Sequence, residues 1–198
     1  DVLPYFLKSE NNELGKSEFH NDKGPITVAN KKINLKLLDE FQNAAEEYGI
    51  PKTNDFNTGD NTGVGFFQFT TSFNKVGLKL RCSAAKGYLN PVKKRSNLKI
   101  IVNAHVQKIN FEGRKATSVN YYLGDNLNTV AANKEIILSA GSIGSPHILQ
   151  VSGIGNIKKL KNLGIDVVSE SNGVGLNLQD HLMFRPVYKV KNLKSLNR

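Results

Sequence analysis

The stretch that most constrains the fold is residues 137–155, ILSAGSIGSPHILQVSGIG. An apolar run leads into a turn of small residues, and helical spacing follows from Ser145-Pro146, which suit the cap and first position of a helix. This order predicts a strand followed by a helix. Glycine and alanine leave the backbone uncovered at 139–146, so that either a ligand or a neighbouring element can approach closely there. Close packing is the commoner cause, and both interpretations stay open.

The remaining pattern mixes helices and strands without regular alternation. Apolar residues at helical spacing predict helices at 1–10, 34–48, 81–89, 146–153 and 157–164, with Asn34 as a cap and Gly49 as a terminator of the second. Apolar or alternating runs predict strands at 25–29, 66–73, 134–141 and 165–168, and a β meander over 98–103, 105–111 and 116–123 with a turn at 112–115. Polar, glycine-containing residues at 52–65 and 172–181 predict connections. The fold class is therefore α+β or mixed α/β.

Composition narrows the class of protein. The net charge is +10, but the lysines are scattered and arginine is scarce, so nucleic-acid binding is not expected. No apolar run reaches the roughly 20 residues that span a bilayer, which leaves membrane association open. The lone Cys82 cannot form an internal disulfide, and this favours a cytoplasmic location. Because the chain begins at Asp1 inside a helical pattern, we expect an internal piece of a longer protein.

Other candidate sites are weak. Gly153-Ile154-Gly155 and Gly173-Val174-Gly175 are each half of a dinucleotide fingerprint and serve equally well as bends. Asp55 and Asp60 lack the spacing of a calcium loop, so a polar loop is expected. Four scattered histidines and one cysteine predict no metal site. The histidines are His20, His105, His147 and His181.

The residues from 141 to 155 resemble the second signature of the glucose–methanol–choline (GMC) family of flavin-dependent oxidoreductases. The matching pieces, in order, are Gly141-Ser142, Ser145-Pro146, Ile148-Leu149 and Ser152-Gly153-Ile154-Gly155. Further similar segments are DVLPYFLKSE, GPITV, RCSAAKGYLNPV, NLKIIVNAHVQKINFEG, NLGIDVV and GVGLNLQDH, so the resemblance covers essentially the whole chain. It is closest to choline-dehydrogenase-like members, among which Cys82 replaces a frequent aromatic residue.

The resemblance implies a fold and a cofactor site. Residues 79–182 would form part of a GMC-type FAD-binding domain, built of a β meander and strand–helix units. Residues 1–78 would belong mainly to an antiparallel-sheet substrate domain, to which 183–198 return. The backbone of Val106 would pair with the adenine edge, and Ala140 and Gly141 would lie close to the adenosine.

The resemblance also implies an activity. Family members oxidise the CH–OH group of an alcohol, here a choline-like or other primary alcohol, by hydride transfer to FAD, which oxygen or another electron acceptor then reoxidises. The catalytic histidine and its His or Asn partner would follow Arg198, so the chain would carry no catalytic residue and its own four histidines are poor candidates for the base. An alternative is a catalytically inactive, free-standing nucleotide-binding or interaction module with the same fold.

Overall fold

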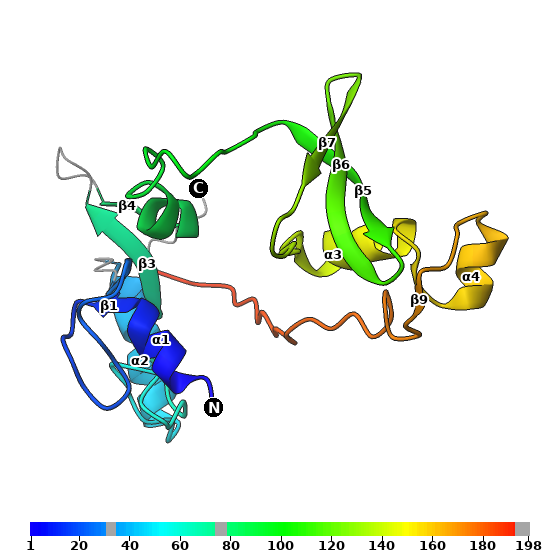
Figure 1. The fold of residues 1–198 in the computed structure, drawn as a ribbon. Helices are drawn as coiled ribbons and strands as arrows, with labels where there is room; N and C mark the ends of the chain where they lie inside the picture. The colour runs from blue at the N-terminus through cyan, green and yellow to red at the C-terminus, as the bar shows by residue number, and fades with distance from the viewer. Residues whose placement is uncertain (31–34, 74–78, 193–198) are drawn as a thin grey trace. The chain divides into compact units, whose positions relative to one another are not determined.

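The computed structural model describes residues 1–30, 35–73 and 79–192, which form two compact units. Unit 1 comprises Asp1–Lys99 with Pro186–Arg198, and unit 2 comprises Ile100–Arg185 (Figure 1). The division at Lys99 and Ile100 falls later in the chain than the domain boundary predicted at 78 and 79. The assignment of either unit to a cofactor or a substrate domain stays a prediction.

Unit 1 is built on a four-stranded sheet in the order β1-β2-β3-β4. Its strands are β1 (Glu10–Asn12), β2 (Ile26–Asn30), β3 (Gln68–Phe73) and β4 (Lys79–Arg81). The pairs β2–β3 and β3–β4 are antiparallel, whereas β1 and β2 run parallel. The parallel pair makes the sheet mixed rather than wholly antiparallel, because the loop between the two strands returns the chain to the same end of the sheet.

The predicted helices of unit 1 are confirmed. They are α1 (Leu3–Ser9), α2 (Lys36–Glu47) and a short π-helical turn, η1 (Ala85–Leu89). Gly49, with φ +96°, follows the end of α2 as expected for a glycine terminator. Asn34, the predicted cap of α2, lies outside the described residues. The ring of Tyr188 lies 6.4 Å from that of Phe41 on α2, which brings the last part of the chain onto this unit.

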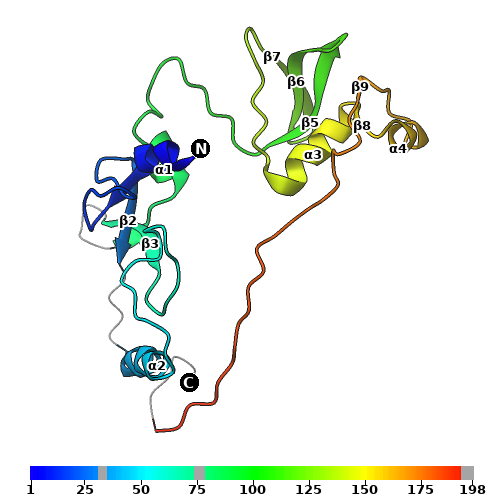
Figure 2. The same ribbon diagram turned by 90° about the horizontal axis from the view of Figure 1, so that it is seen from below.

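Unit 2 contains an antiparallel β meander with α3 packed against its first strand (Figures 1 and 2). The strands are β5 (Ala104–Glu112), β6 (Lys115–Leu123) and β7 (Asn126–Ala131), and the helix is α3 (Gly141–Val151). The turn at 112–115 is confirmed, because Glu112 pairs with Lys115 across it. A parallel pair, β8 (Ile154–Gly155) and β9 (Ser169–Glu170), flanks α4 (Ile157–Asn162).

Two close contacts hold the end of α3 and the residue that follows it against the rest of unit 2. Ser152, directly after α3, is 6% exposed; its Oγ accepts the Ile109 N–H at 2.8 Å and donates to the Ile148 carbonyl at 2.6 Å. Gly153 has φ +88°, and a Cβ there would collide with the Asp166 carbonyl oxygen. The small residues of this motif therefore serve close packing at their carboxyl end.

Several helices and strands differ from those predicted from the sequence. Residues 98–103, 134–141 and 165–168 are not strands, and β7 was not predicted. In the second of these segments Ile137 is 78% exposed, because no strand of the described chain pairs with this apolar run. The helix predicted from Ser145-Pro146 begins earlier, at Gly141, so Pro146 lies inside it. A proline at this position lacks the N–H that would bond to the carbonyl four residues earlier.

Within the part of the chain that the structure describes, we find no helix that is both long enough and apolar enough to cross a bilayer.

Candidate functional site

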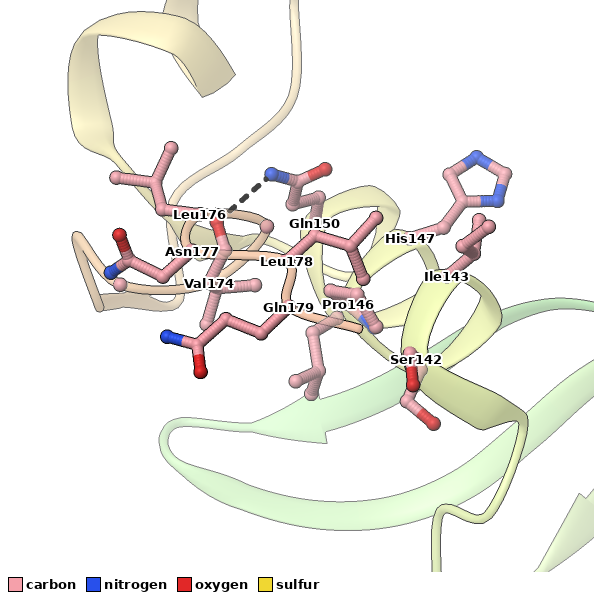
Figure 3. Close-up of a pocket in the computed structure, with 14 residues that line it drawn as sticks. Ser142, Ile143, Pro146, His147, Gln150, Val174, Leu176, Asn177, Leu178 and Gln179 are labelled. Atoms are coloured by element: carbon pink, nitrogen blue, oxygen red, sulfur yellow. Dashed lines mark hydrogen bonds between the residues drawn. The ribbon is translucent and has the colours of Figure 1, made fainter. Parts of the chain in front are cut away.

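A cavity of about 700 Å³ lies in unit 2 between α3 and the segment 173–179 (Figure 3). One wall comes from α3, and the opposite wall comes from a turn that follows β9. The α3 wall is formed by Ser142, Ile143, Ser145, Pro146, His147, Leu149 and Gln150. The walls offer hydroxyl, imidazole and amide groups within a largely aliphatic surface, which suits a ligand with both apolar and polar parts.

The two walls are joined by one side chain. Gln150 Nε2 donates to the Val174 carbonyl at 3.2 Å, and Figure 3 shows the amide reaching from α3 to the turn. Gly175 has φ +79°, and a Cβ there would lie 2.6 Å from Gln150 Nε2. The left-handed turn conformation therefore favours glycine at 175, and a Cβ there would make the end of the Gln150 side chain shift.

The amino-terminal end of α3 is open. Gly141 has φ +81°, and no atom lies within 4 Å of the position that a Cβ would take. The neighbouring Ala140 N–H is satisfied by Ser145 Oγ at 3.0 Å, which fixes the backbone of this turn. An uncovered backbone at the positive end of an 11-residue helix fits a polar or anionic group that approaches closely.

The predicted cofactor residues lie on two elements that pack against each other, β5 and the start of α3. Val106 lies on β5, where it pairs with Tyr121 of β6. Ala140 and Gly141 begin α3 and are exposed, and neither lines the cavity. The hydrogen bond that ties α3 to β5 lies at the other end of the helix, between Ser152 and Ile109. Their joint contact with one ligand stays a prediction.

The histidines have different surroundings. His105, His147 and His181 are exposed, whereas His20 in unit 1 is buried. His147 lies on the wall of the α3 cavity. The Asp180 carboxylate accepts the backbone N–H of His181 at 2.8 Å, so this contact does not involve the imidazole. Over residues 1–30, 35–73 and 79–192 no group of three or more His, Cys, Asp or Glu side chains is arranged to hold a metal ion.

The opposite wall of the cavity was missed by sequence reasoning, which predicted residues 172–181 only as a glycine-bent connection. The available signal was Gly175, which has a positive φ, since glycine often marks a close approach of two segments. The partner of that approach, Gln150, has no such signal.

Comparison with known proteins finds similarity along nearly the whole chain. The sequence profile described as GMC oxidoreductase matches residues 1–183. An oxygen-dependent choline dehydrogenase of Pectobacterium carotovorum is 41% identical over 197 residues, which are 99% of this chain and 34% of that protein. The mitochondrial choline dehydrogenase of Homo sapiens is 42% identical over 180 residues, 91% of this chain and 30% of that protein.

Solved structures of two oxidoreductases also match this chain. An FAD-dependent oxidoreductase from Chaetomium thermophilum matches with a TM-score of 0.82 and 34% identity, over 90% of this chain and 33% of that one. A fungal aryl-alcohol oxidase matches with a TM-score of 0.77 and 26% identity, over 90% and 32%. The chain thus spans about a third of the length of the relatives that it matches.

Proposed function

The chain belongs to the GMC oxidoreductase family, and from this premise we propose that the protein containing it binds FAD and oxidises the CH–OH group of an alcohol. Bound FAD would supply the hydride acceptor for this reaction. The catalytic histidine and its His or Asn partner are proposed to lie outside the 198 residues. The chain's own contribution is to bind and orient the cofactor.

Unit 2 is proposed as the cofactor-binding part. The backbone of Val106 would meet the adenine edge, and Ala140 with Gly141 would lie against the adenosine. The observation that carries this proposal is the open, left-handed Gly141 at the start of α3. An uncovered backbone is a fitting place for a group that must touch it.

Gly141→Ala tests the cofactor site, with Gly113→Ala as its matched control. Both glycines have a positive φ, +81° and +60°, and at both the space around a Cβ is open, so the backbone strain of the two variants is similar. We expect Gly141→Ala to raise the dissociation constant for FAD roughly tenfold, a loss of about 1.4 kcal/mol, and Gly113→Ala to leave it unchanged. Flavin fluorescence of the reconstituted full-length protein gives both values; equal affinities would refute the assignment.

A choline-like primary alcohol is the proposed substrate, on the strength of the names of the related dehydrogenases. The electron acceptor would be oxygen or another carrier, and the proposed location is cytoplasmic. Dye reduction dependent on choline, compared with other primary alcohols and with oxygen uptake, tests the substrate and the acceptor. FAD binding without oxidation of any alcohol would favour the alternative, a catalytically inactive nucleotide-binding module.

A further inference from the structure

His20 is a buried imidazole held between two carboxylates. It is 5% exposed; its Nδ1 lies 2.9 Å from Glu10 Oε2, and its Nε2 lies 2.8 Å from Asp55 Oδ2. The side chains of Glu10 and Asp55 are themselves mostly buried. A neutral imidazole has one N–H and one acceptor nitrogen, so it can donate to only one carboxylate. Two contacts of this length therefore require a proton on both ring nitrogens, or a proton on a carboxyl group.

The surroundings of the ring favour the first arrangement. The Asn12 amide, from a side chain on β1, donates to Glu10 Oε1 at 3.0 Å and to Gln68 Oε1 on β3 at 3.3 Å. Its nitrogen also lies 3.1 Å from His20 Nδ1, but the two oxygens take both amide hydrogens, so Nδ1 does not accept one. The backbone N–H of Asn21 donates to Glu10 Oε2 at 3.3 Å. These donors stabilise the ionised form of Glu10, because hydrogen bonds to a carboxylate favour its charged form. Among the described groups, the charged ones that contact the ring are Glu10 and Asp55.

Asp55 belongs to a loop, residues 51–65, that closes on itself. The Thr53 N–H donates to the Val64 carbonyl at 2.9 Å, and the Val64 N–H donates to the Pro51 carbonyl at 2.8 Å. This neck sets the ends of the loop but not its position over the sheet. The position depends on two neighbouring residues of another segment, since Asp55 meets His20, and a Cβ at Gly59 would lie 3.1 Å from the ring of Phe19.

The loop and the buried ring enclose a second cavity, of about 600 Å³, in unit 1. The 51–65 loop contributes Asn57 and Gly59, and the sheet contributes Glu10, Val28 and Thr70. His20 and Phe19 also line this cavity. Because His20 bridges Glu10 on the sheet and Asp55 on the loop, this bridge sets the position of the loop wall.

We infer that His20 is a positioning residue that carries a proton on both ring nitrogens and fastens the 51–65 loop to β1, thereby fixing the wall of the unit 1 cavity. We call the His20 ring, with its contacts to Glu10 and Asp55, the latch. The ring donates hydrogen bonds to both carboxylates only when the imidazole is charged. This inference does not depend on the proposed oxidation of an alcohol.

The charge state gives the latch a pH dependence. Burial lowers the pKa of His20, but the hydrogen bonds and negative charges of Glu10 and Asp55 outweigh it, so the pKa is raised above the ordinary 6.5. A histidine with a raised pKa in the folded state stabilises that state fully below the ordinary value. The stabilisation is lost as the pH rises through the raised value, so the loop should loosen in alkaline solution.

Nitrogen NMR of the full-length protein, labelled at histidine, tests the charge directly and requires no variant. We expect the resonances of His20 to show protons on both nitrogens at and somewhat above pH 6.5. A neutral ring with one proton throughout this range would overturn the inference.

Hydrogen exchange tests the latch: the exchange rates of amides in residues 51–65 are compared with those of residues 104–123 in the same full-length protein. His20→Gln should reduce the protection of the loop about tenfold or more below pH 6.5, since it leaves buried carboxylates without their partner. Asp55→Asn should give a similar loss, and the double variant should lose little beyond either single change, because both remove the same contact.

His181→Gln is the matched control, since this imidazole is exposed and lies outside the reference segment. Its loop protection should equal that of the unmodified protein. Two results would overturn the latch: protection in His20→Gln equal to that of the control, or additive losses in the double variant.

Discussion

Unit 1 secures a loop through a buried imidazole between two carboxylates, whereas unit 2 secures α3 through one hydroxyl and closely approaching glycines. The buried polar side chains of the described chain follow the same division, with Asn12 and His20 in unit 1 and Ser152 in unit 2. The contact of His20 with the two carboxylates weakens when the imidazole loses a proton, whereas packing between uncharged groups does not change with pH. The two contacts should therefore respond differently to pH.

The largest effect is expected where the fit of unit 2 is tightest. Gly153→Ala adds a Cβ that collides with the Asp166 carbonyl oxygen, at a residue with φ +88°. We expect a loss of about 4 kcal/mol in the free energy of unfolding. Gly164→Ala is the control: its φ is +69° but the space is open, so only the conformational cost of about 1 kcal/mol applies. Urea denaturation of the full-length protein measures both, and equal losses would contradict the steric explanation.

An intermediate effect distinguishes the hydroxyl of unit 2 from the imidazole of unit 1. Ser152→Ala leaves the Ile109 N–H without its acceptor, so we expect a loss of about 2 kcal/mol in the free energy of unfolding. This loss should be the same below pH 6.5 and well above it, whereas the loss caused by His20→Gln should shrink as the pH rises. Thermal unfolding at the two pH values checks both. A Ser152→Ala loss that varied with pH would break the comparison.

The smallest effect is expected for a charged contact at the surface of unit 1. Lys52 Nζ lies 2.7 Å from Glu46 Oε2, and both side chains are well exposed. Glu46→Gln should change the free energy of unfolding by less than about 0.5 kcal/mol, because water screens the pair. The same denaturation series measures it. A loss as large as that of Ser152→Ala would show that charge in unit 1 stabilises regardless of burial.

Some segments that pair with near neighbours in sequence were predicted, although β7, which pairs with β6 across a short turn, was not. The strands at 105–111 and 116–123 formed as expected, because the turn at 112–115 brings them together over a short distance. The apolar run at 134–141 has the same β-rich composition, yet no strand of the described chain pairs with it. Strand formation depends on partners, and a sequence pattern does not supply them. We propose that the partners of 134–141 lie elsewhere in the protein.

The sites were predicted less completely than the elements. Gly141 was singled out from a small-residue motif, and its contact with a cofactor stays a prediction. The latch was not found, because His20, Glu10 and Asp55 are separated in sequence and meet only after the sheet and the 51–65 loop have formed. Asp55 was correctly predicted as part of a polar loop, but the sequence does not show that its carboxylate points inward.

The hairpin between β5 and β6 has a practical consequence. Gly113, in its turn, has φ +60° and open space on all sides, and the turn joins two nine-residue strands that pair along their length. Exposed turns of this kind tolerate inserted sequence well. A short peptide tag or a fluorescent label at residue 113 should therefore report on unit 2 without disturbing the cavity beside α3 or the cavity in unit 1.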